Sequence, residues 1–136
     1  MWWGSNPHGR FNMDFPSADP ATINNYHAHI YYDPATTRAA ADELRSIISE
    51  KFPDMRVGRW HDELVGPHLR SMYQVVFAPE CFAEFVPWLA MNRRDLSVLV
   101  HPSAEISYND HVHYGMWLGN KLPLREEVLG RGPRNG

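Results

Sequence analysis

Cysteine is almost missing from this chain, because Cys81 is the single cysteine in 136 residues. An intramolecular disulfide is therefore excluded, and no cysteine pair exists for a zinc ribbon or a redox motif. Basic charge is not in excess either, since 13 lysine and arginine residues stand against 16 acidic ones. The excess of positive charge that a protein needs to bind the phosphate backbone of a nucleic acid is missing. We expect a reducing compartment and no nucleic-acid partner.

Long apolar runs and nucleotide-binding loops are also lacking. No run approaches the roughly 20 apolar residues of a membrane span, and the first residues do not have the regions of a signal peptide. Glycine-rich phosphate loops and the nucleophile elbow of serine hydrolases do not occur. We therefore expect a cytoplasmic protein with no membrane partner.

Histidine, in contrast, is abundant, with eight residues. Beside one cysteine, a bound metal ion would have to be held mainly by imidazole. The length fits one domain, and a chain that is 43% hydrophobic and 21% charged has ordinary globular composition. Proline, glycine and polar residues near the start predict a loose tail over residues 1–22. We expect one domain over residues 23–129 and a frayed end over residues 130–136.

Hydrophobic periodicity predicts strands at residues 26–32, 55–60, 70–77 and 96–100. A helix is expected from Asp33 and Pro34, and a second from Pro79 with a kink or restart at Pro87. The apolar face predicted for the first helix consists of Ala40, Leu44, Ile47 and Ile48. Residues 106–119 alternate ambiguously and could add an edge strand, and residues 124–129 could form a terminal helical turn.

The order β-α-β-β-α-β is that of an α+β, ferredoxin-like sandwich in which two helices cover one face of an antiparallel sheet. The other sheet face would then be bare, and large bare apolar patches are rare on monomers. We expect a tail or a second subunit to cover it. A homodimer joined through its sheets, in an α/β barrel-type assembly, is the predicted state.

Side chains alternate across a strand, so His27, His29 and Tyr31 should share the face opposite Ala28 and Ile30. In the ferredoxin-like order the first strand is central, and its start approaches the end of the last strand, where His101 stands. Two histidines two residues apart with a distant third are a usual way to build an open site for zinc or Fe(II).

Several further residues are candidates for this site. A carboxylate could complete it, from Glu63, Glu105 or Asp110, or a third histidine could replace the carboxylate. His111 and His113 form a second pair with the same spacing, which spacing alone cannot rank. Arginines suited to a substrate carboxylate are Arg59, Arg70, Arg93 and Arg94. By contrast, His8 and His61 are expected to be incidental and Cys81 to be a small buried hydrophobe.

Five motifs stand in unbroken order over residues 23–120. They are YHAHIYY at 26–32, VGPH at 65–68, FVPWLAMNR at 85–93, HP at 101–102, and DH at 110–111 with WLG at 117–119. Together they resemble the DOPA 4,5-dioxygenase family of aromatic ring-cleaving enzymes. The resemblance implies a small ferredoxin-like domain that dimerises and performs extradiol cleavage of a catechol with O₂ at non-haem Fe(II).

The histidines of this chain that match the motifs of the family are His27, His29, His68, His101 and His111. We predict His27, His29 and His101 as metal ligands, with His68 left as an alternative to His27. His68 and His111 are predicted as catalytic groups, and Tyr31 and Arg59 as substrate contacts. Zinc or another divalent ion can take the place of iron in a recombinant sample.

Two other functions fit the same residues. The chain could be a metal-free dimeric module that binds a small aromatic ligand or a protein partner on its open sheet face. It could also be a hydrolase or isomerase with zinc in a three-histidine site. The sequence does not identify which catechol is used or which ring bond is cleaved.

Overall fold

The computed structural model describes residues 18–133 and has an α+β fold. Its strands are β1 (Asn25–Tyr32), β2 (Arg56–Val57), β3 (Ser71–Phe77), β4 (Val98–Ser103) and β5 (Met116–Leu118). Its two main helices are α1 (Arg38–Lys51) and α2 (Phe82–Asn92). Four short turns of helix complete it, namely η1 (Pro20–Thr22), η2 (Pro79–Cys81), η3 (Asn109–His113) and η4 (Glu126–Val128). No helix within residues 18–133 is long and apolar enough to cross a membrane.

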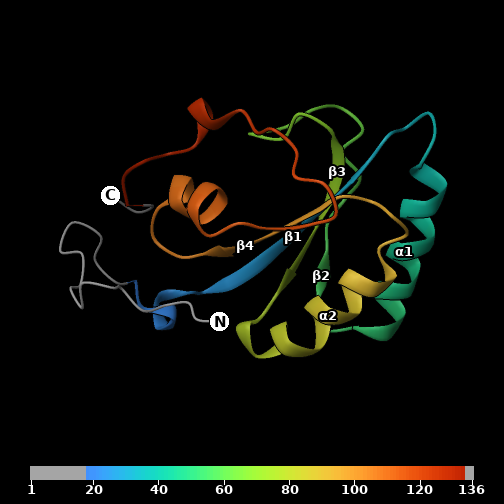
Figure 1. The fold of residues 1–136 in the computed structure, drawn as a ribbon. Helices are drawn as coiled ribbons and strands as arrows, with labels where there is room; N and C mark the ends of the chain where they lie inside the picture. The colour runs from blue at the N-terminus through green and yellow to red at the C-terminus, as the bar shows by residue number, and fades with distance from the viewer. Residues whose placement is uncertain (1–17, 134–136) are drawn as a thin grey trace, which may run out of the picture.

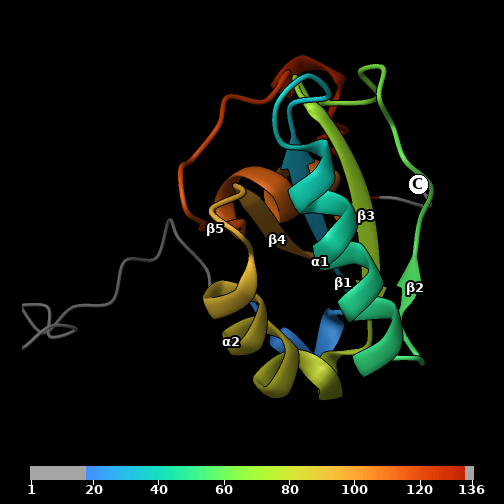
Figure 2. The same cartoon turned by 90° about the vertical axis from the view of Figure 1, so that its right-hand side faces the viewer.

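The strands form one antiparallel sheet in the order β2-β3-β1-β4-β5. Through β4 the chain follows the predicted order of elements, and it then adds β5 beside β4. Figure 2 shows α1 and α2 on the same face of this sheet. The central position of β1, between β3 and β4, places its side chains within reach of both neighbours.

The main core lies between the two helices and the sheet. β1 contributes Ala28 and Ile30 to it, and β4 contributes Val98 and Val100, all fully buried. The alternate residues of these strands, which include His27, His29 and Tyr31, face the other way. The predicted alternation along the first strand is therefore confirmed, and this second face of the sheet, the histidine face, carries most of the polar chemistry.

The first helix begins later than predicted. Asp33 accepts a hydrogen bond from the backbone N–H of Ala35, residues 34–37 form turns, and α1 starts at Arg38. Its buried face consists of Ala41, Leu44 and Ile48 rather than the predicted set with Ala40 and Ile47. Three consecutive alanines at 39–41 suit either face, so only packing against the sheet selects among them.

The second helix runs continuously through Pro87, and the expected restart is absent. A proline at this position removes one backbone donor, which would have bonded to the carbonyl of Ala83. Phe85 and Leu89 are fully buried on the core side of α2. Their packing holds the helix together despite the missing hydrogen bond.

Part of the histidine face is covered by the chain's own C-terminal segment. Residues 119–133, here called the strap, cross this face after β5 (Figure 1). Leu122 and Leu124 of the strap pack on a small apolar cluster of Tyr31, Met72 and Leu99. The expectation that only a tail or a second subunit covers this face is corrected there, because the strap supplies the apolar cover.

The region between β4 and β5 also differs from the expected edge strand. Only Met116–Leu118 forms a strand, whereas residues 107–113 are helical and include η3. At the end of the described chain, the backbone N–H of Tyr108 donates to the carbonyl of Gly130, and Ile106 pairs with Pro133. The predicted helical turn within residues 124–129 is present as η4. Of the predicted loose tail over residues 1–22, the last part is described and contains η1, whereas residues 1–17 lie outside the described residues.

Candidate metal centre

Two neighbouring strands bring three histidines together on the histidine face. β1 pairs with β4 so that His27 stands directly opposite His101, and His29 stands opposite Leu99, two residues along. The Nε2 atoms of His29 and His101 are 2.9 Å apart. Strand alternation and antiparallel register are thus enough to converge three imidazoles on one point.

Two further histidines reach the same point from outside the sheet. His68 lies in the loop that precedes β3, and the centre of its ring is 4.1 Å from that of His29. His111 lies in η3, with its ring centre 3.8 Å from that of His101. The five side chains together form the histidine cluster, and all except His27 are buried.

Within residues 18–133, two sets of three side chains have their ligand atoms within 4.8 Å of one another. The sheet triad is His27, His29 and His101, and the outer triad is His29, His68 and His111. His29 belongs to both. No carboxylate joins either triad among the described residues, so imidazole is the only ligand type available at this point.

Hydrogen bonds decide which ring nitrogen two of these histidines present. The Nδ1 atom of His101 lies 2.8 Å from the carbonyl oxygen of Pro102, and that of His111 lies 2.8 Å from the carbonyl of Ser107. A carbonyl only accepts, so both Nδ1 atoms carry the proton and donate. In each neutral ring Nε2 then keeps a lone pair, which is the arrangement that metal-binding histidines usually have.

His68 has a different kind of partner. Its Nδ1 atom lies 2.7 Å from the hydroxyl oxygen of Tyr31, and a phenol can donate or accept. Tyr31 is buried, and its ring stacks on that of Trp117. Burial raises the pKa of the Tyr31 hydroxyl, so the group stays neutral. The predicted substrate contact at Tyr31 remains untested, but its hydroxyl is already engaged by His68.

Burial and mutual repulsion hold the cluster neutral. Burial, followed by the charges of neighbouring histidines, lowers the pKa of His68 to about 4 and that of His101 to about 2. The pKa of His29 is lowered well below its usual value for the same two reasons. At pH 7 these imidazoles are therefore uncharged and keep a lone pair for a cation.

The donor set fits a divalent metal ion. The Nδ1 atom of His29 is buried without a hydrogen-bond partner, which is costly for a polar atom. Several neutral imidazoles that converge without an acidic partner have little reason to be buried together in a core. Zinc and Fe(II) both accept such nitrogen ligands.

Among the described residues, none of the other predicted candidates belongs to either triad. Glu63 and Glu105 are exposed, and His113 is exposed on the same turn that buries His111. The buried Asp110 accepts a hydrogen bond from the backbone N–H of Ala104 through Oδ2. The second pair, His111 and His113, stands on a helical turn and not on an edge strand, and the turn buries His111 and exposes His113.

Arg59 is exposed, and its Nη1 atom donates to the carbonyl of Trp60 at 3.5 Å. Its predicted contact with substrate is not tested by this arrangement. Sequence reasoning did not identify the strap as a part of the site, nor the bond between Tyr31 and His68. No local pattern signals either of them, since both depend on segments that are distant in the chain.

Comparisons with known proteins agree with the family resemblance of the sequence. The family model described as the Dopa 4,5-dioxygenase family matches residues 26–128. In the solved structures, a proposed dioxygenase from Nostoc punctiforme is similar with a TM-score of 0.79 and 41% identity. The likeness covers 82% of this chain and 96% of that one.

Two curated proteins are similar in sequence. An uncharacterised 21.2 kDa protein of Botryotinia fuckeliana is 38% identical over 116 residues, which is 78% of this chain. A DOPA 4,5-dioxygenase of Amanita muscaria is 31% identical over 118 residues, which is 82% of this chain. The matched regions span 63% and 52% of the length of these two relatives.

Proposed function

The chain belongs to the Dopa 4,5-dioxygenase family, and we propose that it cleaves the ring of a catechol with O₂ at a non-haem Fe(II) ion. The observation that carries this proposal is the histidine cluster. Its imidazoles are buried, neutral and convergent, and the Nε2 atoms of His29 and His101 are 2.9 Å apart. An iron ion would supply a redox-active binding site for the diol and for O₂.

We propose His27, His29 and His101 as the residues that hold the metal. All three stand on β1 and β4, whose pairing in the middle of the sheet keeps their spacing constant. The proton on Nδ1 of His101 is committed to the Pro102 carbonyl, so Nε2 of His101 is permanently available as a ligand. Three ligands leave positions open for a substrate, as a catalytic site requires.

His68 and His111 are then the proposed catalytic groups. Each has its Nδ1 engaged, by the Tyr31 hydroxyl and the Ser107 carbonyl respectively, so Nε2 is the atom that would meet the substrate. A neutral imidazole can accept the proton of a catechol hydroxyl at this atom. The pKa of His68, about 4, means that its ring is unprotonated near neutral pH.

The apolar cluster beside the site has a separate role in this proposal. Tyr31, Leu99 and Trp117 pack together under Leu122 and Leu124 of the strap. They exclude water from one side of the histidine cluster, which strengthens the hydrogen bonds inside it. We propose Tyr31 as the residue that orients His68, and Arg59 remains a predicted substrate contact.

The assembly proposed for the chain extends the same family relationship. The four strands β2-β3-β1-β4 and the helices α1 and α2 support classification as a ferredoxin-like sandwich. We propose that two such domains, each over residues 23–129, pair into a homodimer. Sedimentation or light scattering of the purified chain would test this part independently of catalysis.

Metal analysis and oxygen uptake test the function directly. Protein grown with iron should contain bound metal, and anaerobic reconstitution with Fe(II) should give O₂ uptake that requires a catechol. A protein that binds no metal and consumes no O₂ with any catechol would instead be a binding module. Zinc-supported activity without O₂ consumption would indicate a hydrolase or isomerase.

The assignment of ligands has its own test. His27→Ala should lose bound iron, because it removes one member of the sheet triad. His68→Ala should keep iron and lose turnover, because it removes a proposed catalytic group. The reverse pattern, with iron retained in H27A and lost in H68A, would assign the metal to the outer triad of His29, His68 and His111.

A further inference from the structure

The histidine cluster is exposed on one side only. His29, His68, His101 and His111 are each no more than 9% exposed, whereas His27 is half-buried. η3 packs on β4, and the strap crosses from β5 to the loop before β3, where Leu124 pairs with His68 and contacts the cluster that includes Met72. Toward the opposite end of β3, beside His27 and His29, the side chains of Val76 and Gln74 are half-buried. Among the described residues, the approach to the cluster that we infer therefore passes over this end of β3.

The register of the sheet places an arginine at the end of this approach. His101, His27, Val76 and Arg56 stand in one row across β4, β1, β3 and β2. Residues directly opposite in a sheet share a face, so Arg56 belongs to the histidine face, while its neighbour Val57 packs on the main core. With strands about 4.8 Å apart, the backbone of Arg56 is about 10 Å from that of His27.

The adjacent row adds no large side chain beside this arginine, because Gly58 follows Val57 there. There His29 stands opposite Gln74, and the backbone N–H of Gly58 donates to the carbonyl of Gln74 at 2.7 Å. Gly58 has no side chain, and an added Cβ would lie 3.2 Å from that same carbonyl oxygen. Between His27 and Arg56 the surface thus consists of the side chains of Gln74 and Val76, one neutral polar and one apolar. This composition suits contact with an aromatic ring.

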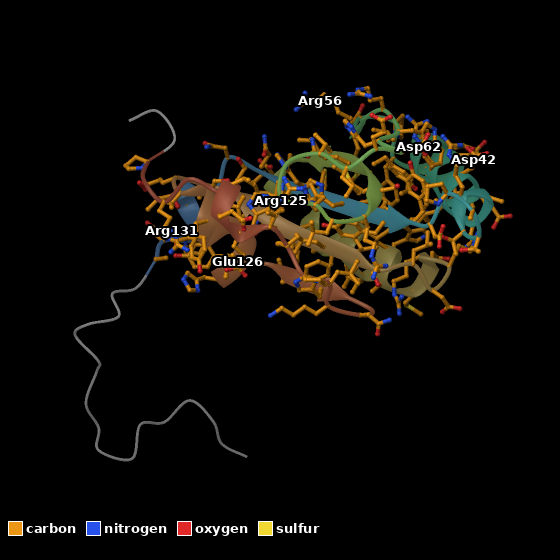
Figure 3. The ribbon with its side chains drawn as sticks, turned by 90° about the horizontal axis from the view of Figure 1, so that it is seen from above. Asp42, Arg56, Asp62, Arg125, Glu126 and Arg131 are labelled. Atoms are coloured by element: carbon orange, nitrogen blue, oxygen red, sulfur yellow. The ribbon has the colours of Figure 1, made fainter. Side chains whose placement is uncertain are left out.

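Arg56 has no charged partner of its own. The ion pairs within residues 18–133 are Arg38 with Asp62 and Arg94 with Glu43. Arg56 is exposed, and Figure 3 shows it at the outer edge of the molecule, with its side chain reaching into solvent. The row that it shares with His27 contains no carboxylate. An unpaired guanidinium at this place favours an anion and disfavours a cation.

We propose that Arg56 is a specificity-determining residue that selects catechols carrying a carboxylate on a short side chain. This inference rests on the proposed function, because the diol must be anchored at the sheet triad. The ring then lies over Gln74 and Val76, and the carboxylate accepts hydrogen bonds from the Arg56 guanidinium. A catechol with a neutral substituent loses that contact, and one with an ammonium group is repelled.

Three catechols of different charge test the proposal. Dihydrocaffeate is anionic, methylcatechol is neutral and dopamine is cationic. Their binding is measured by calorimetry on the zinc-loaded protein, which performs no oxidation, and their KM values by O₂ uptake with Fe(II). The wild-type chain should bind dihydrocaffeate most tightly and dopamine most weakly, with steps of about threefold to fivefold, as for exposed ion pairs.

Two substitutions at the arginine give opposite expectations. Arg56→Gln should remove the differences among the three ligands and leave methylcatechol binding unchanged. Arg56→Glu should reverse the order and favour dopamine. Lys51→Gln is the matched control, since Lys51 is an exposed cation at the end of α1, on the opposite face of the sheet, and it should leave the order intact.

The outcomes separate this inference from the proposed function. Wild-type protein that binds and cleaves catechols without preference for charge, or a preference that R56Q leaves intact, overturns the role of Arg56 alone. Wild-type protein that neither binds nor cleaves any of the three catechols overturns the proposed function itself.

Discussion

His29 and His101 face each other through their Nε2 atoms, 2.9 Å apart, across the two central strands β1 and β4. Because Nδ1 of His101 donates to a carbonyl, its Nε2 is an acceptor, and the shared proton belongs to Nε2 of His29. For both Nε2 atoms to hold a metal ion, the proton of His29 would have to move from Nε2 to its Nδ1 atom, which has no hydrogen-bond partner. The pair is thus the point on which the metal proposal depends.

Removal of either ring of this pair should abolish metal binding. His29→Ala and His101→Ala each delete one of the three proposed ligands. We expect iron content below about a tenth of the wild-type value with the fold retained, because even residues that hydrogen-bond to metal ligands contribute about tenfold to a hundredfold to metal affinity. Metal analysis with circular dichroism is the measurement. His113→Ala, exposed on the turn of His111, is the control. Full iron content in H29A and H101A would contradict the assignment.

Tyr31 and Tyr32 are adjacent on β1, and their side chains point to opposite faces of the sheet. Tyr31→Phe removes the hydroxyl that holds Nδ1 of His68, so kcat should fall about tenfold to a hundredfold while iron content stays unchanged. Tyr32→Phe removes a bond to Asp62 away from the site and should cost about 1 kcal/mol of stability without changing kcat. Steady-state kinetics and urea unfolding distinguish them. Equal kcat values in both variants would remove Tyr31 from the site.

Gly115 allows the chain to turn back closely after η3. An added Cβ would lie 2.3 Å from the backbone oxygen of His111 and 3.0 Å from the side chain of Leu99. Gly115→Ala should therefore displace the turn that carries His111, lower kcat, and destabilise the protein by about 1–3 kcal/mol. Gly130→Ala meets nothing within 4 Å and is the control. A G115A protein with wild-type stability and turnover would contradict the close packing of this turn.

The buried histidines make the metal-free protein sensitive to acid. The pKa of His68 is lowered to about 4 and that of His101 to about 2, whereas both titrate near 6.5 when unfolded. Below pH 6.5 the unfolded chain binds more protons than the folded one, so stability falls as pH decreases toward 4. His68 alone accounts for up to about 3 kcal/mol of this loss.

Urea unfolding of the metal-free protein at several pH values between 7.5 and 4.5 measures this dependence. His68→Gln has one titrating group fewer and should lose less stability over the same range. If the wild-type stability is constant between pH 7 and pH 5, the histidines are more hydrated than the structure indicates.

Local features of this protein were predictable from sequence. Alternation along residues 26–32 separated His27 and His29 from Ala28 and Ile30, because successive side chains of a strand point to opposite faces whatever the fold. The order of strands and helices followed from periodicity for the same reason. The start of α1 and the choice among its three alanines did not, since several registers of a helix satisfy the same pattern.

The sequence by itself determined that histidine, and not cysteine, would hold any metal, and it determined which histidines share a strand face. Tertiary structure decided which of them meet. His29 and His101 are 72 residues apart, and their contact depends on the register between β1 and β4. The helical turn that carries His111, the loop that carries His68 and the strap beside them are positioned by packing between distant segments. Local periodicity carries no information about such packing, because it reports only how each segment arranges its own side chains.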